Sequence, residues 1–369
     1  MSAPVAVTHL VENLERGGLE RVVIDLVGAQ LELGYRCQVV CLFEQGALAQ
    51  ELVSRGVPVE ACGKRTGADP RAVLRARGHL RRHRSSVLHT HNMAAHYHGI
   101  AAAIGLGVRR RINTRHGMGS IGAPGRRDWL FARTMRVTDA VVTVCEAARR
   151  DLLARGIAPG KLVVVPNGIR VEAFTPASDD ARARLAARLG LRADSRLVGF
   201  VGRLNPAKDP ATLIRAFARA AGDRPEAALV LTGDGPLRGA LEEVARATGL
   251  ANRIVFLGDR GDVRELLPAF ELFALSSLTE GYSIALLEAC ASALPIVATA
   301  VGGNAEIVRE GVNGMLVPAG DEGRFAEALG TLLADPARSR RMGAAGREWV
   351  LEHGSLRRMA ADYARLYEP

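Results

Sequence analysis

The chain has 369 residues, of which 48% are hydrophobic and 24% charged, a balance that excludes a disordered or fibrous protein. This length favours two domains, because a single hydrophobic core seldom grows beyond about 250–300 residues. The net charge is +10, and all of the excess lies in residues 1–175, which carry 25 Lys and Arg against 14 Asp and Glu.

The uneven charge narrows the classes of partner. Only 4% of the residues are aromatic, and the chain has no RNA-recognition or helix-turn-helix signature, so we expect no nucleic-acid partner. The basic first half suits an anionic membrane surface or a phosphorylated acceptor, and a solvated arginine-rich face is the alternative. The chain shows no signal peptide, and its longest apolar stretch, Ser283–Gly303, is interrupted by Glu288 and Pro295. We therefore expect a cytoplasmic protein, peripheral at most to the inner membrane face.

Short β-branched runs alternate with helical patterns along the chain, which predicts two parallel α/β domains. The strands predicted in the first half are Val5–Val11, Cys37–Phe43, Pro58–Ala61, Ser86–Thr90, Arg111–Thr114, Ala140–Val144 and Leu162–Val165. Those predicted in the second half are Leu197–Val201, Ala228–Thr232, Arg253–Leu257, Leu272–Ala274, Ile296–Ala298 and Gly314–Val317. Turn residues in Thr175–Asp180 place the boundary between domains 1–175 and 176–354. Two such doubly wound domains would face a central cleft at the carboxyl ends of their strands.

The cysteine pattern disfavours both disulfides and zinc. The five cysteines form no C-x-x-C pair and are odd in number. Cys37 and Cys41 share a predicted strand and lie too far apart to bridge, so we expect buried, reduced thiols.

A glycine pair, Gly17 and Gly18, follows the first predicted strand and precedes the helical pattern Leu19–Leu33. Glycines there let the backbone approach a phosphate at a helix N-terminus. The pair does not complete a G-x-G-x-x-G fingerprint, and a plain tight turn is the alternative.

Histidines crowd the end of the fourth predicted strand. His89 and His91 would share one strand face, whereas His96 and His98 would diverge on the following helix. Because no cysteine or paired carboxylate completes a ligand set, we expect no metal ion there. His116 follows the next strand, where its ring could reach a sugar hydroxyl or the reacting centre, and a structural role is the alternative.

The second half carries anion-binding chemistry at its strand ends. The run Gly202–Asp209 places Arg203 and Lys208 just before a predicted helix that begins at Pro210, a pairing that suits a diphosphate. Gly233–Pro236 and Leu257–Asp262 end the next two strands, and we expect them to line a nucleotide site, the second near the base.

Two carboxylates stand eight residues apart at Glu280 and Glu288. If a helix begins near Ser283, Glu280 lies in the loop before it and Glu288 in its second turn. The amides of Gly281 to Ile284 would then face an anion. The spacing indicates a sugar-nucleotide site, and two solvated acids on an exposed helix are the alternative.

Together with Pro166–Gly168 and Gly302–Glu306, these motifs resemble the family-four retaining glycosyltransferases of GT-B fold, also called glycosyltransferase group 1. The resemblance covers the whole chain. It implies that Arg203 and Lys208 bind the donor diphosphate, Glu288 the ribose and Glu280 the hydroxyls of the transferred sugar. It also implies that a C-terminal helix, about 355–369, packs back on the first domain.

The same resemblance implies further site residues. His116 matches the family's position beside the donor sugar, and Tyr282 and Ser283 stand where Phe and Gly are frequent. The predicted catalytic residues are thus His116, Glu280, Arg203 and Lys208. The predicted substrate-binding residues are Gly17, Gly18, Gly233, Gly281, Tyr282, Ser283, Ile284 and Glu288.

The resemblance implies transfer of a hexosyl group, with retention, from a nucleoside diphosphate sugar to a hydroxyl of a glycan or lipid-linked acceptor. No D-x-D triplet is present, so we expect neither a metal ion nor another cofactor. Acceptor choice is expected in the loop Gly117–Arg127. The alternatives are a sugar-nucleotide epimerase of the same architecture and a non-catalytic nucleotide-sugar binding protein.

Overall fold

The computed structural model describes residues 4–67, 69–118 and 126–368, so most of the expected acceptor loop Gly117–Arg127 lies outside the described residues. The chain divides into two compact units. The first comprises Met1–Gly168 together with Leu356–Pro369, and the second comprises Ile169–Ser355.

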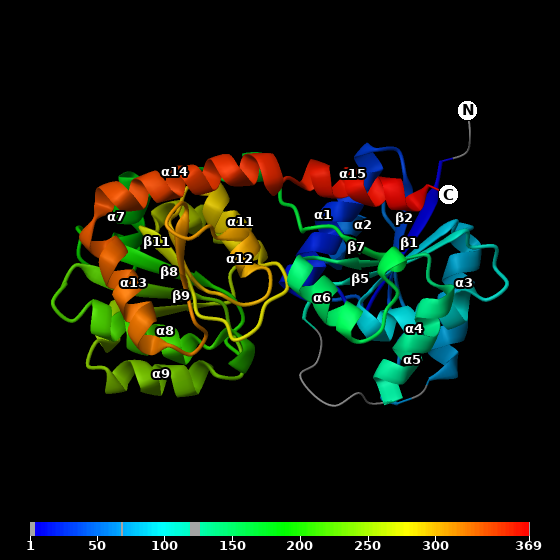
Figure 1. The fold of residues 1–369 in the computed structure, drawn as a ribbon, viewed down its shortest axis with the longest axis horizontal. Helices are drawn as coiled ribbons and strands as arrows, with labels where there is room; N and C mark the ends of the chain where they lie inside the picture. The colour runs from blue at the N-terminus through cyan, green and yellow to red at the C-terminus, as the bar shows by residue number, and fades with distance from the viewer. Residues whose placement is uncertain (1–3, 68, 119–125, 369) are drawn as a thin grey trace. The chain divides into compact units, whose positions relative to one another are not determined.

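The first unit is built on a seven-stranded parallel sheet with the order β3-β2-β1-β4-β5-β6-β7 (Figure 1). Its strands are β1 (Ala6–Val11), β2 (Arg36–Cys41), β3 (Val59–Ala61), β4 (Val87–His91), β5 (Arg110–Arg115), β6 (Ala140–Thr143) and β7 (Leu162–Val164). Its helices are α1 (Gly18–Glu32), α2 (Ala49–Val53), α3 (Pro70–His83), α4 (Asn92–Ala103), α5 (Arg126–Thr134), α6 (Glu146–Ala154) and α15 (Leu356–Tyr367), with 3-10 turns η1 (Met135–Val137) and η2 (Pro159–Lys161).

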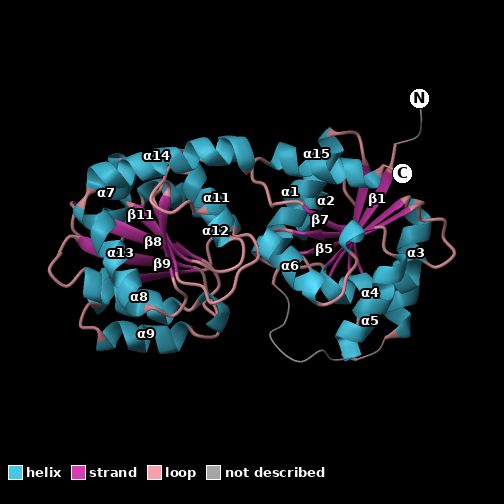
Figure 2. Cartoon of the chain, viewed as in Figure 1, coloured by secondary structure: helices cyan, strands magenta, loops and turns pink. Residues whose placement is uncertain are grey.

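The second unit repeats the scheme with a six-stranded parallel sheet in the order β10-β9-β8-β11-β12-β13 (Figure 2). Its strands are β8 (Arg196–Val201), β9 (Ala227–Thr232), β10 (Ile254–Gly258), β11 (Leu272–Leu275), β12 (Ile296–Thr299) and β13 (Gly314–Val317). Its helices are α7 (Asp179–Arg188), α8 (Pro210–Ala220), α9 (Arg238–Ala247), α10 (Val263–Leu266), α11 (Ile284–Ala291), α12 (Asn304–Ile307), α13 (Glu322–Ala334) and α14 (Pro336–His353). The 3-10 turns are η3 (Val171–Ala173), η4 (Pro206–Lys208), η5 (Ala251–Arg253) and η6 (Leu267–Ala269).

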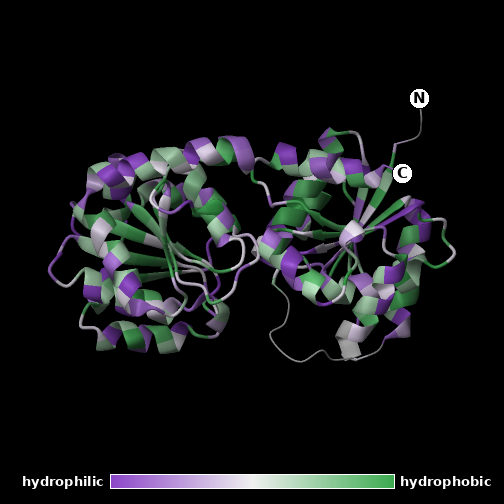
Figure 3. Cartoon of the chain, viewed as in Figure 1, coloured by the Kyte–Doolittle hydropathy of each residue, from purple (hydrophilic) through white to green (hydrophobic). Residues whose placement is uncertain are grey.

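Most of the strands are apolar, because helices cover both faces of each sheet and most strand residues are therefore buried; β5, with the sequence Arg-Arg-Ile-Asn-Thr-Arg, is an exception (Figure 3). In β9 every residue is buried, as is every residue of β1. The fold class predicted from the sequence, two doubly wound Rossmann-like sheets, is confirmed. All five cysteines are buried and none of them forms a disulfide, as predicted.

The last helix, α15, belongs to the first unit and packs on α1. It buries Tyr363 and Tyr367, which are 1% and 3% exposed. The Tyr367 hydroxyl accepts a hydrogen bond from Gln30 Nε2 at 2.8 Å, and the Tyr363 hydroxyl lies 3.0 Å from Thr114 Oγ1. These buried polar contacts tie the end of the chain to the first sheet.

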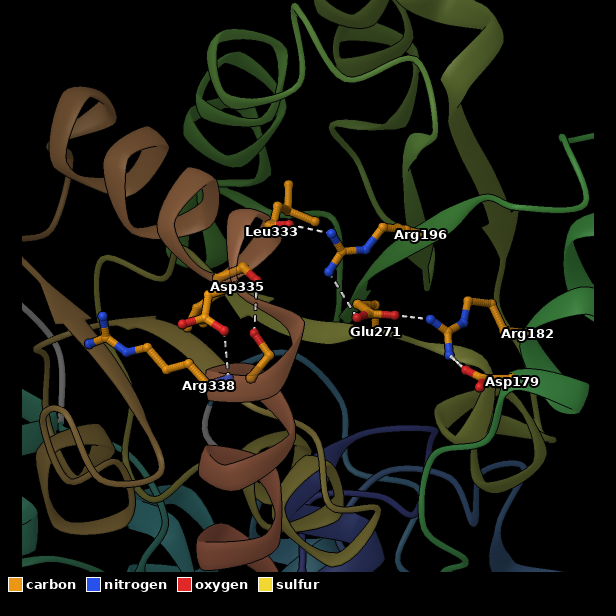
Figure 4. A network of polar contacts seen from close by, with 9 residues as sticks. Asp179, Arg182, Arg196, Glu271, Leu333, Asp335 and Arg338 are labelled. Carbon is orange, nitrogen blue, oxygen red and sulfur yellow. Dashed lines mark hydrogen bonds and ion pairs between the residues drawn. The ribbon is translucent and has the colours of Figure 1, made fainter.

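A partly buried network of ion pairs lies in the second unit (Figure 4). The Glu271 carboxylate, whose side chain is only 9% exposed, lies between Arg182 and Arg196, and its Oε1 is 2.9 Å from Arg196 Nη2. Arg196 also donates to the carbonyl oxygen of Leu333. The network thereby joins α7, the edge of β8, the segment before β11 and the end of α13.

No helix in the described part of the chain combines the length and apolar character needed to cross a bilayer.

Candidate functional site

The predicted site residues divide between the two units. Gly17, Gly18 and His116 belong to the first unit, and all the others belong to the second. Most of them follow the two strands between which the chain reverses its direction across the sheet, β1 and β4 in the first unit and β8 and β11 in the second, where open α/β sheets bind ligands. His116, after β5, and Gly233, after β9, each follow a strand next to one of these.

In the second unit this reversal falls between β8 and β11, which are adjacent in the sheet. The loop after β8 carries Arg203 and Lys208, and the loop after β11 carries Glu280. Hydrogen bonds join these loops: Ser276 Oγ donates to the carbonyl oxygens of Lys208 and Asp209 at 3.1 and 2.7 Å. The sheet topology thus brings together residues that are far apart in the sequence.

The centre of this site is an ion pair between the Lys208 ammonium and the Glu280 carboxylate. Glu280 is only 8% exposed, and the Lys208 side chain is 24% exposed. The same carboxylate oxygen, Oε1, accepts a hydrogen bond from Ser277 Oγ at 2.6 Å. The sequence analysis did not predict Ser277 as a site residue. The only indication in the sequence is that its hydroxyl lies three residues before Glu280, a predicted site acid. The three residues form a nearly buried, preorganised polar cluster.

The two helices beside this cluster differ at their N-termini. Asp209, at the N-cap of α8, accepts a hydrogen bond from the Thr212 amide, and Pro210 has no amide hydrogen to offer. Ser283 occupies the N-cap of α11 as predicted, but its side chain makes no capping hydrogen bond. The first-turn amides of α11 therefore have no side-chain cap and are the better anion donors.

Glycines allow close backbone approach between the loops of the site. Gly233 has φ of +127°, and a Cβ there would overlap the carbonyl oxygen of Gly202. Gly302, with φ of +52°, is pressed in the same way against the carbonyl oxygen of Glu280. The Gly303 amide donates to the Gly281 carbonyl at 2.7 Å. Larger side chains at these positions would force the loops apart.

The other predicted residues of the second unit lie in the loops after β8 and β11 and in helix α11. Arg203 is exposed, and its guanidinium makes no hydrogen bond or ion pair with the residues that the structure describes. Tyr282 is 6% exposed, Ser283 is buried, and Ile284 and Glu288 are half-buried at the start of α11 and in its second turn. Arg203 is thus a cation with an open guanidinium, whereas the Lys208 ammonium is already paired.

In the first unit Gly17 is the N-cap of α1, with extended backbone, and Gly18 is the first helical residue. The glycine pair therefore stands at a helix N-terminus, as predicted. The Glu20 carboxylate folds over the same terminus, close enough to overlap a Cβ built at Gly17. An anion bound to these amides would have to displace that carboxylate.

His116 follows β5, is half-buried, and ends a chain of rings whose other members, His91 and His9, are fully buried. His91 Nδ1 lies 2.9 Å from His116 Nε2, and His9 Nδ1 lies 3.0 Å from His91 Nε2. Burial lowers the pKa of His9 to about 4 and that of His116 to about 3, and it holds the pKa of His89 and His91 well below 6.5. All four rings are therefore neutral at pH 7. The sequence paired His89 with His91 on one strand face but missed His9.

Ligand atoms of His9, His89 and His91 lie within 4.8 Å of one another, the spacing of a metal-binding group. Both ring nitrogens of His9 and His89 already contact other side chains, so a metal ion would have to displace buried hydrogen bonds. His96 and His98 diverge as predicted: His96 lies between Thr90 and Thr138, and His98 contacts the carbonyl oxygen of Ala94.

Family models match both halves of the chain. The model described as glycosyl transferases group 1 matches residues 181–349, and the model described as Glycosyltransferase Family 4 matches residues 16–173.

The chain is also similar to characterised bacterial enzymes. A GDP-mannose-dependent alpha-(1-6)-phosphatidylinositol monomannoside mannosyltransferase from Mycolicibacterium smegmatis is 34% identical over 75% of this chain and 76% of that protein. An alpha-maltose-1-phosphate synthase from the same organism is 33% identical over 65% of both chains. A D-inositol 3-phosphate glycosyltransferase from Stackebrandtia nassauensis is 36% identical over 50% of this chain and 44% of that protein. The match thus spans less than two thirds of the latter two relatives.

Solved structures share the fold at low sequence identity. Anabaena Alr3699/HepE in complex with UDP-glucose superposes with a TM-score of 0.84 at 23% identity, covering 98% of both chains. TarM superposes with a TM-score of 0.82 at 11% identity over 100% of this chain and 99% of that one.

Proposed function

Because this chain belongs to glycosyltransferase family 4, whose members transfer sugars from nucleotide donors with retention, we propose that it moves a hexosyl group from a nucleoside diphosphate sugar to a glycan or lipid-linked hydroxyl. The observation that carries the proposal is the Lys208–Glu280 cluster between β8 and β11. It sets a cation and a hydrogen-bond acceptor side by side where a diphosphate and its sugar would meet.

The chemical difficulty in this reaction is the departure of a doubly charged diphosphate from an oxocarbenium-like sugar. In our proposal, Arg203, Lys208 and the first-turn amides of α11 stabilise that developing charge. Each preorganised donor of this kind contributes about 3 kcal/mol, or roughly 10²- to 10³-fold in rate. The pairing with Glu280 holds the ammonium in place before substrate arrives, so little reorganisation is needed when the charge appears.

The two acids have separate proposed roles. The Glu280 carboxylate receives Lys208 and Ser277 on the same oxygen, Oε1, which leaves Oε2 as an acceptor for hydroxyls of the transferred sugar. Glu288, in the second turn of α11, accepts hydrogen bonds from the ribose. His116 of the first unit accepts a hydrogen bond from a substrate hydroxyl.

We also propose that no metal ion takes part, since the charge on the leaving group is met by cationic side chains and amides. If a chelator abolishes turnover and Mn²⁺ restores it, this part of the proposal is wrong. The acceptor is proposed to be a glycan or a lipid-linked hydroxyl, as the name of the mycolicibacterial relative suggests, with the basic first unit attracting anionic headgroups.

The first experiment is a thermal-shift screen of UDP, GDP and ADP sugars, because a ligand that binds only the folded state raises the melting temperature. Turnover of the best donor is then measured for Lys208→Ala and Arg203→Ala, with Arg324→Ala as control. The Arg324 side chain is 71% exposed, and its ion pair with Asp321 is 3.9 Å long. We expect each site variant to lose roughly 10²-fold and the control to be unchanged.

A loss below about fivefold in both site variants would contradict the diphosphate role. Incubation with donor alone tests the epimerase alternative: formation of an isomeric sugar nucleotide supports epimerisation, whereas no change or slow hydrolysis supports transfer. A binding protein without catalysis would show a thermal shift and no turnover with any acceptor.

A further inference from the structure

A branched chain of hydrogen bonds runs through the interior of the first unit from His116 to the C-terminal helix. Its first branch joins His116 Nε2 to His91 Nδ1, His91 Nε2 to His9 Nδ1, and His9 Nε2 to Gln30 Oε1 at 2.8 Å. Its second branch starts at the amide nitrogen of the same glutamine. That branch runs through Tyr367, His89 and Thr114 to Tyr363.

Every contact in the first branch joins one hydrogen to one lone pair, because all three rings are neutral at pH 7. A neutral imidazole has one N–H donor and one acceptor nitrogen. The direction of the first hydrogen bond therefore fixes the direction of all the others. Reversing one ring would set two donors or two lone pairs against each other.

Gln30 sets that direction. Its Oε1 lies 3.4 Å from Cys37 Sγ, and burial raises the pKa of this thiol to about 12, so the thiol keeps its hydrogen and donates. The Gln30 amide nitrogen faces the Tyr367 hydroxyl on the other side. The oxygen therefore points to His9, and a carbonyl oxygen can only accept. His9 must donate through Nε2–H, which leaves its Nδ1 as an acceptor.

The same step repeats along the branch. His91 donates to His9 through Nε2–H and accepts at Nδ1, and His116 donates to His91 through Nε2–H. His116 Nδ1 is then left with a lone pair, and this atom is itself buried and makes no hydrogen bond with the described residues. The ring is also held through the backbone, since the His116 amide donates to Asn92 Oδ1 at 3.1 Å.

We propose that Gln30, His9 and His91 are positioning residues that hold His116 in the Nε2–H tautomer, so that its Nδ1 accepts a hydrogen bond from a substrate hydroxyl. The inference rests on the proposed function for the identity of the ligand. The tautomers themselves are properties of the free protein.

The decisive measurement is a ¹⁵N spectrum of the imidazole side chains at pH 7, without substrate, in protein labelled at histidine. Single His→Gln variants assign the signals of the nine histidines. We expect His9, His91 and His116 all to carry hydrogen on Nε2, with couplings across the hydrogen bonds from Nε2 of His91 to Nδ1 of His9 and from Nε2 of His116 to Nδ1 of His91. Hydrogen on Nδ1 of any of these rings, or a doubly protonated ring, overturns the proposal.

A pair of variants separates positioning from ordinary structural support. Gln30→Met removes the fixed acceptor at nearly constant size, and we expect His116 to become a mixture of both tautomers. Tyr363→Phe removes a buried hydroxyl of the other branch, and we expect His116 to stay Nε2–H. An unchanged His116 tautomer in Gln30→Met refutes the role of Gln30. If that variant does not fold, the wild-type spectrum alone decides.

Turnover provides a separate readout. In an active enzyme we expect Gln30→Met to lower kcat/KM by roughly tenfold, the lower end of the cost of losing a supporting partner, while Tyr363→Phe stays within about twofold. An unchanged kcat/KM in Gln30→Met would show that the tautomer has no role in the reaction. A protein with the expected tautomers but no transfer activity would contradict the proposed function and leave the hydrogen-bond assignment intact.

Discussion

Acid should destabilise the first unit and spare the second. The first unit contains eight of the nine histidines, and the second contains only His353, whose side chain is exposed. Burial lowers the pKa of His9 to about 4 and the pKa of His96 and His116 to about 3, against 6.5 for an ordinary histidine. Protonation therefore favours the unfolded state, and stability that is complete above pH 6.5 is lost as the pH falls toward 4.

The magnitude follows from the pKa difference. A pH of 5 is 1.5 units below the pKa of histidine in the unfolded state and still above its pKa in the folded state. At roughly 1.4 kcal/mol per unit, each such ring therefore lowers the free energy of unfolding by about 2 kcal/mol. Several rings together approach the whole stability of a domain, about 5–15 kcal/mol. We thus expect the first unit to unfold near pH 5 while the second remains folded.

Hydrogen exchange read by mass spectrometry at pH 7.5 and pH 5, corrected for intrinsic exchange rates, resolves the two units. His96→Gln is the variant to compare with the wild type. The His96 ring makes its hydrogen bonds with the hydroxyls of Thr90 and Thr138, and it is not part of the branched chain. Between the two pH values, the free energy of unfolding of the first unit should fall by about 2 kcal/mol less in this variant than in the wild type. Equal losses in both units, or an unchanged pH dependence in this variant, would refute the reasoning.

Three further perturbations test the second unit. Glu271→Ala removes the carboxylate that lies between Arg182 and Arg196, whose side chains are only 18% and 17% exposed, and should lower the free energy of unfolding in urea by about 3 kcal/mol. Asp179→Ala, at a 97% exposed partner of the same network, should cost under about 0.5 kcal/mol, and similar costs would contradict the burial argument. Gly233→Ala forces a side chain against a carbonyl oxygen at positive φ, so its melting temperature should fall by several degrees in differential scanning calorimetry, and an unchanged value would disprove the close approach. Ser277→Ala removes a buried hydrogen bond to Glu280, so the free energy of unfolding should fall by about 1 kcal/mol and kcat/KM should fall roughly fivefold, and full activity would exclude a supporting role.

The fold was predictable because its signals are local. Short apolar runs mark most of the strands, and helical patterns of ten or more residues fill most of the gaps between them. Strand ends were predicted to within two residues, since the apolar patterns themselves end there.

The site was only partly predictable. Residue types and strand ends pointed to Lys208 and Glu280, but their direct pairing is a contact across 72 residues that depends on β8 lying beside β11. The link between Gln30 and Tyr367 spans 337 residues and leaves no periodic trace in the sequence. Asp209 caps the N-terminus of α8 from a left-handed backbone conformation, with φ of +41°. An aspartate can adopt that conformation but does not require it, so the sequence alone does not predict the cap.

The membership of α15 in the first unit has a consequence for biosynthesis. Translation proceeds from the N-terminus, so the whole second unit leaves the ribosome before the helix that completes the first core. Until then, the surface of α1 that this helix will cover, together with the Gln30 amide, stays open to water or to chaperones. A chain released before Leu356 would contain all of the second unit but would lack the helix that completes the first.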